Sequence, residues 1–138
     1  MNKPERSNPV EVAQPIGKYS HLTRVPEGKQ LVFIAGQVGN DQGGILAATA
    51  REQTVLALRN VERLLLSMKA GPEDLVRLLT FVAGTENVSG FIAGRDEVFA
   101  EWFPEHDYPG HSLAVATALV SPEVFVEIEG WAAVLPIS

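Results

Sequence analysis

Cysteine is absent from this chain, which excludes disulfides, thiolate metal sites and cysteine nucleophiles. No apolar run approaches the ~18 residues that a membrane span requires. The N-terminus also lacks a basic segment leading into an apolar core, as a signal peptide would have. We therefore expect a cytoplasmic protein that has no membrane partner.

Positive charge is scarce, with 11 Lys and Arg against 17 Asp and Glu, a net charge of −6 and a pI near 5.0. The basic residues are scattered and are not interleaved with aromatics, so we expect no nucleic-acid partner. The three histidines show no metal-ligand spacing. The glycine-rich loop at 39–44 lacks the spaced glycines and the Lys-Ser/Thr of a P-loop. We expect neither a metal nor a cofactor.

The 138 residues fit a single domain. Residues 1–14 are polar, contain two prolines and have no hydrophobic period, so we expect a flexible N-terminal arm there. Residues 15–138 form the expected domain.

Two helices and five strands are expected within this domain. Thr49 and Glu52 have the spacing of a capping box, and the helix that they begin carries one apolar stripe, expected to stop at Gly71-Pro72. A second helix follows a cap at Asn87 or Ser89 and ends at Pro104. The expected strands are Tyr19 to Val25, Gln30 to Val38, Leu75 to Val82, Ser112 to Ala118 and Val124 to Val134.

This order, β-β-α-β-α-β-β, predicts an α+β sandwich in which two helices pack on one face of a single mixed sheet. The strands at 31–38 and 75–82 are apolar on both faces, yet the helices cover only one of them. Self-association is the simplest way to bury the other face.

The last strand places two carboxylates between two large aromatics. Val124, Val126 and Ile128 alternate with a set of larger or charged residues, Phe125, Glu127, Glu129 and Trp131. Burying a carboxylate is unfavourable unless it is paired or hydrogen-bonded, so this second face is either open to water or part of a polar site. A glycosidase is disfavoured, since no sugar-binding aromatic platform is evident.

Seven segments, taken in order, form a recognisable set: Gly17-Lys-Tyr19, Ile34-Ala-Gly-Gln37, Gln53-Thr with Leu58-Arg-Asn60, Ala70-Gly-Pro-Glu-Asp74, Phe99 with Trp102-Phe103, Tyr108-Pro-Gly-His-Ser112 and Val126-Glu-Ile-Glu129. Together they resemble the RidA/YjgF family, whose members were once called translation inhibitors or perchloric-acid-soluble ribonucleases. The resemblance implies a chorismate-mutase-like fold, a homotrimer with three clefts between subunits, and hydrolysis of 2-imino or enamine acids to 2-keto acids and ammonia.

The resemblance also implies site residues. Tyr19 and Glu127 match the tyrosine and glutamate of the family's cleft, whereas His111 stands in place of the arginine that grips the substrate carboxylate. The further residues that line the cleft by this resemblance are Ala35, which replaces a serine, Gly36, Asp96, which replaces an asparagine, and Ser112. A histidine is mostly neutral at pH 7 and offers one donor. Glu127 nearby would raise the pKa of His111 and make the two an acid/base pair.

Two functions from different classes remain open. The first is a homotrimer that binds a small polar metabolite and, if it is an enzyme, hydrolyses or deaminates an imine or enamine other than the usual 2-imino acids without a cofactor. Its catalytic residues would be Glu127 and His111. The alternative is a non-catalytic ligand-binding or regulatory trimer that keeps the cleft but has lost the chemistry. Apart from either function, His111 and Tyr19 could each be an interface residue without a role in the cleft. RNA cleavage, the third candidate, is disfavoured by the acidic balance.

Overall fold

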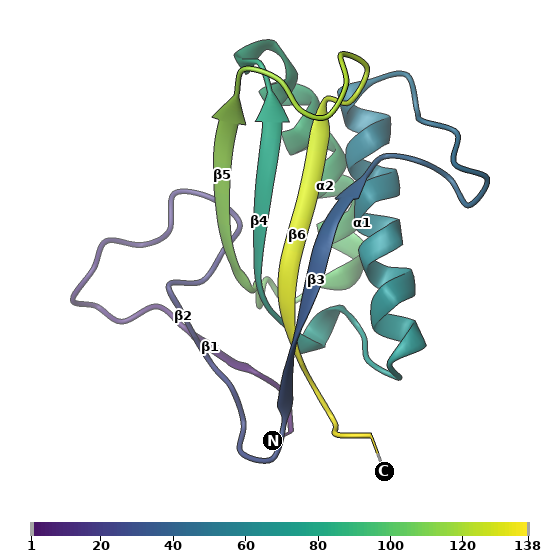
Figure 1. The fold of residues 1–138 in the computed structure, drawn as a ribbon. Coiled ribbons are helices and arrows are strands. Elements are labelled where there is room, and N and C mark those ends of the chain that lie inside the picture. The colour runs from purple at the N-terminus through teal and green to yellow at the C-terminus, as the bar shows by residue number, and fades with distance from the viewer. Residues whose placement is uncertain (1, 138) are drawn as a thin grey trace.

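The computed structural model describes residues 2–137. Four strands form one mixed sheet in the order β3-β6-β4-β5, and both long helices cover the same face of it (Figure 1). The elements are β1 (Glu5–Ser7), β2 (Leu22–Arg24), β3 (Gln30–Val38), α1 (Ala50–Ser67), η1 (Pro72–Asp74), β4 (Leu75–Ala83), η2 (Thr85–Asn87), α2 (Val88–Trp102), β5 (Gly110–Ala116) and β6 (Val126–Val134). The predicted two-layer α+β architecture is confirmed.

The first long helix begins where the sequence predicts. The Thr49 hydroxyl accepts a hydrogen bond from the Glu52 backbone N–H at 3.1 Å, which satisfies one of the free donors of the first turn. The apolar stripe is buried at Leu58, Val61 and Leu65. The predicted stop at Gly71-Pro72 is wrong, because the helix ends at Ser67 and Lys69 follows with a left-handed φ of 58°.

The core lies between the sheet and the two helices. Alternate residues of β6, including Val126 and Ile128, are fully buried against it, as the period-2 pattern predicts. The other face of the sheet is open. On it, Leu31, Phe33 and Trp131 are 56%, 47% and 38% exposed, and the rings of Phe33 and Trp131 lie 5.1 Å apart. The prediction of an apolar face that the helices do not cover is confirmed.

The N-terminal segment differs from the expected loose arm. Glu5–Ser7 forms β1, which pairs antiparallel with β2, so these two strands make a separate two-stranded sheet and the single predicted sheet has one strand fewer. The Arg6 side chain, 2% exposed, donates to the backbone carbonyls of Asp107 at 2.7 Å and Leu75 at 2.6 Å and lies over the Phe103 ring. Residue 1 of the expected arm lies outside the described residues.

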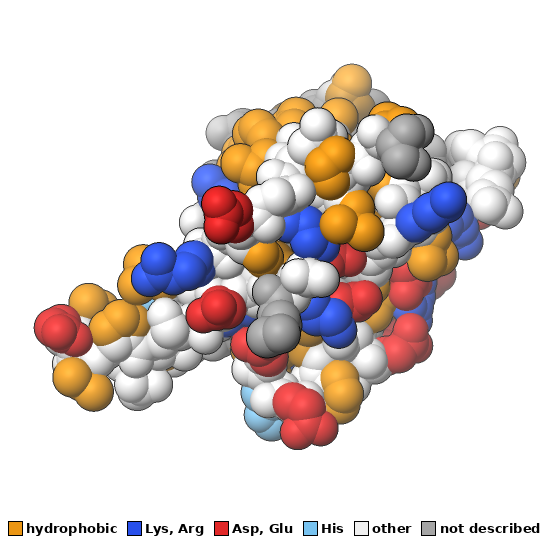
Figure 2. Space-filling view, turned by 90° about the horizontal axis from the view of Figure 1, so that it is seen from below, with side chains coloured by type: hydrophobic (Ala, Val, Ile, Leu, Met, Phe, Trp, Pro, Cys, Tyr) orange, Lys and Arg blue, Asp and Glu red, His pale blue; other side chains and the backbone are white. Residues whose placement is uncertain are grey.

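The chain between β1 and β2 projects from the body. Figure 1 shows it as an extended loop beside the sheet, and Figure 2, seen from below, shows apolar side chains along it. Three of them are exposed: Val10, Val12 and Ile16. This loop leads directly into Tyr19, so its position determines where that side chain lies.

Candidate ligand-binding cleft

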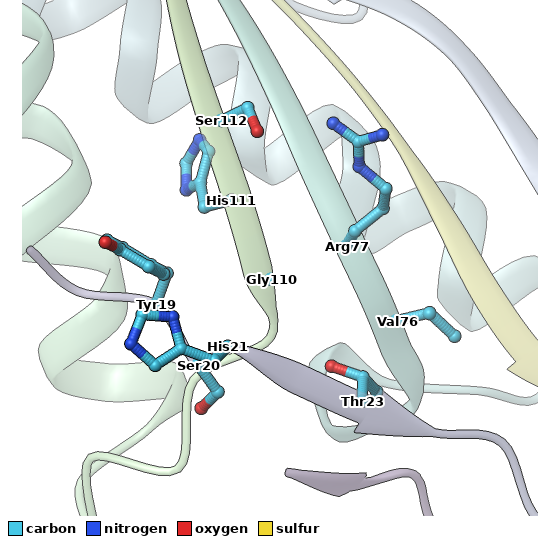
Figure 3. Close-up of a pocket in the computed structure, with 9 residues that line it drawn as sticks. All are labelled: Tyr19, Ser20, His21, Thr23, Val76, Arg77, Gly110, His111 and Ser112. Atoms are coloured by element: carbon cyan, nitrogen blue, oxygen red, sulfur yellow. The ribbon is translucent and has the colours of Figure 1, made fainter. Parts of the chain in front are cut away.

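Three of the seven predicted site residues line one cleft of ≈ 340 Å³ at the start of β5 (Figure 3). They are Tyr19, His111 and Ser112. The cleft lies where the segment before β2 crosses the ends of β4 and β5, because the Ser20 backbone N–H donates to the Pro109 carbonyl at 3.3 Å. The other lining residues are Ser20, His21, Thr23, Val76, Arg77 and Gly110.

His111 faces the helices rather than the open side of the sheet. It pairs with Leu78 in the parallel β4–β5 ladder, and Leu78 is a fully buried core residue. Neighbouring residues across a parallel ladder point to the same face. The imidazole accordingly packs against the rings of Phe91 and Phe99, with centroids 5.9 and 6.1 Å away. Ser112, the next residue, projects to the opposite side (Figure 3).

The imidazole has one hydrogen-bond partner among residues 2–137. Its Nε2 lies 2.8 Å from the Thr80 hydroxyl oxygen, whereas its Nδ1 is buried and has no partner there. The Thr23 hydroxyl, which lines the same cleft, is likewise buried without a partner within the described chain. Native structures leave few such groups unpaired, so these two atoms mark places that a ligand or water would complete.

His111 is neutral at physiological pH. Burial is the main cause, and the positive charges of Arg95 and Arg77 add to it; together they lower the pKa of His111 to about 3. Glu127 of the same chain does not contribute to this pKa, so the expected rise through Glu127 stays a prediction for a cleft between subunits. Arg77 keeps positive charge in the cleft, whereas His111 offers an uncharged hydrogen-bonding group.

Glu127 belongs to a second group, which includes Ala35 and Gly36. The β3–β6 register shifts between Ile34 and Gln37, so Ala35 and Gly36 form an irregular stretch of β3. A Cβ on Gly36 would lie 2.7 Å from the Glu127 carboxyl carbon, so the missing side chain makes room for this carboxylate. The sequence predicted all three residues for the site.

His111 and Glu127 lie on opposite faces of the sheet. Val126 and Ile128 point into the core, so Glu127 between them points to the open face, whereas His111 points toward the helices. The two side chains consequently form no acid/base pair within one chain. A site containing both residues requires more than one copy of the chain.

Asp96 lies outside the cleft and has partners of its own. Its carboxylate accepts from Arg95 at 2.9 Å and forms an ion pair with Lys18 at 3.2 Å. Partial burial alone would raise the pKa of Asp96, but the hydrogen bonds and charges of Arg95 and Lys18 lower it. Because Lys18 precedes Tyr19, Asp96 ties the Tyr19 segment to α2.

Several residues in the cleft or next to it escaped prediction from the sequence. Thr80, which contacts His111 from an apolar strand, gives no signal other than a hydroxyl in a buried run. Arg77 and Thr23 belong to no motif in the sequence.

Within residues 2–137 no three His, Asp or Glu side chains gather in a cluster suited to a metal ion, and no helix there is both long and apolar enough to cross a membrane. The cleft thus offers hydroxyls, a neutral imidazole and a nearby guanidinium.

The fold defines a class: a small α+β protein of chorismate-mutase-like fold. The sequence model described as Endoribonuclease L-PSP matches residues 10–134. The chain therefore belongs to this family, which is the RidA/YjgF family.

Individual relatives agree with this membership. A RutC family protein of Pyrococcus abyssi is 29% identical over 118 residues, covering 84% of this chain and 86% of the relative. The structure of YyfB from Yersinia pestis, of the conserved Rid protein family, superposes with a TM-score of 0.82 at 29% identity over 97% of this chain and 100% of that one. E. coli TdcF, solved with bound serine, shares the fold at 24% identity with a TM-score of 0.68 over 93% of each chain.

Proposed function

We propose that this chain assembles as a homotrimer whose inter-subunit clefts bind a small polar metabolite. The observation that carries the proposal is the separation of the site residues within one chain. His111, in the cleft with Tyr19, points toward the helices, whereas Gly36 and Glu127 lie together on the open face of the sheet. A second copy would bring the open face of one subunit, with its Glu127, against the His111 cleft of the next.

The exposed apolar surface supports this assembly. Leu31, Phe33 and Trp131 share the open face with Glu127, so covering them would also enclose the carboxylate. The projecting segment adds Val10 and Ile16 beside the Tyr19 cleft. Contiguous apolar surface of this kind on a small protein usually marks an interface. Membership of the family supports a small-molecule-binding or imine-deaminase-type role.

The chemistry that fits the two groups is cofactor-free hydrolysis of an imine or enamine. Glu127 orients a water and takes a proton from it, the water oxygen adds to the C=N carbon, and Glu127 passes this proton to the nitrogen. The new hydroxyl then gives its proton to the same nitrogen as the C–N bond breaks, so a carbonyl compound and ammonia leave. His111 donates a hydrogen bond to the substrate, and Tyr19 helps to hold it. Because neutral His111 cannot form a charged bidentate contact, the substrate differs from the usual 2-imino acids.

The test is release of ammonia and keto acid from freshly generated 2-iminobutanoate, with molar mass measured by light scattering. We expect a trimer in every variant, little activity in the wild type and a gain in His111→Arg, which restores the charged fork. Glu127→Gln in the His111→Arg background should abolish that gain. A monomer at micromolar concentration would refute the shared cleft, and an inactive trimeric His111→Arg would refute the imine-type cleft.

One observation favours a second candidate, a binding trimer without turnover. Because the pKa of His111 is low, its imidazole is neutral at neutral pH and cannot act as a general acid. Such a protein would show ligand-dependent thermal stabilisation and no product. Suitable probes are 2-ketobutanoate and L-serine, the latter because TdcF was solved with serine. Stabilisation without turnover of any imine would decide for this candidate.

A further inference from the structure

Arg77 supplies the positive charge of the cleft. Its exposed side chain projects to the open face of the sheet, because Arg77 lies opposite the partly exposed Trp131 in the antiparallel β4–β6 ladder. Within residues 2–137 its guanidinium forms no ion pair, whereas Arg6 donates to backbone carbonyls and Arg95 donates to Asp96. Arg77 is therefore available to an anion from outside the described chain.

Gly110 leaves the space beside Arg77 open. The two residues pair in the parallel β4–β5 ladder, and both line the cleft. A Cβ built on Gly110 would lie 3.5 Å from the Arg77 Cβ and 3.9 Å from the carbonyl oxygen of Ser20. A larger side chain at this position would extend into the space between Arg77 and the Ser20 segment. With glycine there, the floor of the cleft is backbone, and a small group can lie next to the arginine.

Two hydroxyls line the same cleft. The Thr23 hydroxyl oxygen is buried and has no partner among residues 2–137. Ser112 shares the face of Arg77, since it pairs with Leu79, which follows Arg77 by two positions in β4. Figure 3 shows the Ser112 hydroxyl and the Arg77 guanidinium level with each other along their strands. Hydroxyls and a guanidinium can all donate hydrogen bonds to an oxyanion.

We propose that Arg77 holds the negative charge of the ligand, a monocarboxylate that lies over Gly110, and that the Thr23 and Ser112 hydroxyls are further donors to it. The inference names the ligand class of the proposed site, so it rests on the proposed function for the presence of a metabolite there. The planar guanidinium fork matches a carboxylate with two parallel hydrogen bonds. One cation balances one negative charge, so a carboxylate fits better than a phosphate group, which carries close to two charges.

This assignment moves the charged contact away from the position that the resemblance predicts. His111 is neutral and points toward the helices, whereas Arg77 points to the open face. A ligand held by Arg77 therefore has its carboxylate on the side of the sheet opposite to His111. In the proposed trimer a second copy covers the open face, which would shield this ion pair from water and strengthen it.

The first test uses acetate, the smallest stable analogue of such a ligand, and follows the side-chain Nε–H resonances of the arginines in the assembled protein by ¹⁵N NMR. We expect acetate to shift the Arg77 resonance saturably, whereas acetamide, which is neutral and of similar shape, leaves it in place. Arg24, exposed on β2 outside the cleft, is the matched control and should not respond. An unmoved Arg77 resonance, an equal response of Arg24, or tighter binding of inorganic phosphate would overturn the proposal.

The second test measures the affinity for 2-ketobutanoate. Arg77→Gln should weaken binding at least about tenfold, Arg77→Lys less than this, and Arg24→Gln less than about twofold. Light scattering should give the same molar mass for every variant. Dissociation of the assembly in Arg77→Gln would assign this arginine to a contact with a carboxylate of a second copy and would refute the proposal. If acetate binds at Arg77 but 2-ketobutanoate does not bind the wild type, the proposed function fails for that ligand, whereas the assignment of Arg77 stands.

Discussion

Lowering the pH should destabilise this protein through His111, at pH values above those at which the carboxylates of the protein titrate. The pKa of His111 is about 3 in the folded chain, against about 6.5 for an unfolded histidine. Below pH 6.5 His111 binds a proton in the unfolded chain, whereas in the folded chain it binds one only near pH 3. Because the folded pKa is the lower one, stability is complete above pH 6.5 and is lost as the pH falls toward 3.

The size of the effect follows from the two pKa values. Each pH unit inside this window removes about 1.4 kcal/mol, so lowering the pH from 7 to 5 should remove about 2 kcal/mol through His111 alone. The lowered pKa values of Asp96 and Glu101 also make the folded state less stable in acid, but this loss occurs at pH values below the ordinary pKa of a carboxyl group. The interval from pH 7 to 5 therefore isolates the histidine.

The assay is denaturant unfolding at both pH values, comparing the wild type with His111→Gln, which is uncharged throughout. The protein concentration stays fixed because assembly contributes to the measured stability. The difference between the two proteins should change by about 2 kcal/mol in favour of His111→Gln on going from pH 7 to 5. An unchanged difference would mean that His111 takes its proton near pH 6.5 while folded, and burial beside Arg95 and Arg77 would then be refuted as the cause of a low pKa.

Three further substitutions test the rest of the structure. Gly36→Ala should displace the Glu127 carboxylate and weaken ligand binding while the fold survives; unaltered binding would contradict the contact. Gln53→Leu should reduce the free energy of unfolding by about 2–4 kcal/mol, because this buried amide donates to two loop carbonyls and accepts from the Phe125 N–H. A change below about 1 kcal/mol would argue against that role. Arg6→Met should lower the melting temperature more than Glu5→Met at the exposed neighbouring position, because the buried Arg6 side chain donates to the backbone carbonyls of Asp107 and Leu75; equal effects would count against this anchoring role.

Most of the fold could be predicted from the sequence because the long elements carry strong periods. The Thr49 cap, the helical stripe and the apolar strand at 30–38 were each recognisable from neighbouring residues alone. The short elements could not be recognised in this way. β1 and β2 have three residues each and are held by pairing with each other and by contacts of Arg6 with residues far away in the sequence. Lys69 ended a helix in a conformation that glycine usually adopts, which no local pattern indicated.

The composition of the site could be predicted more reliably than its geometry. Resemblance named Tyr19, Gly36 and Glu127, and the structure brings the last two together. The face of His111 could not be predicted, because β5 reads Gly-His-Ser-Leu-Ala-Val-Ala and carries apolar residues at both parities. Only the β4–β5 register, which pairs His111 with Leu78, decides that it points toward the helices. This register also keeps His111 away from Glu127 of the same chain.

The division of the site between two faces of one chain has a genetic consequence. In the proposed trimer each cleft takes its His111 from one subunit and its Glu127 from the next. Two alleles, one defective in each residue, would therefore complement one another. Any ring that contains both kinds of subunit has one position where an intact His111 meets an intact Glu127, so random mixing in equal amounts would rebuild about a quarter of the clefts. Neither parent could form a working cleft alone, and a cell carrying both alleles would regain part of the function that each had lost.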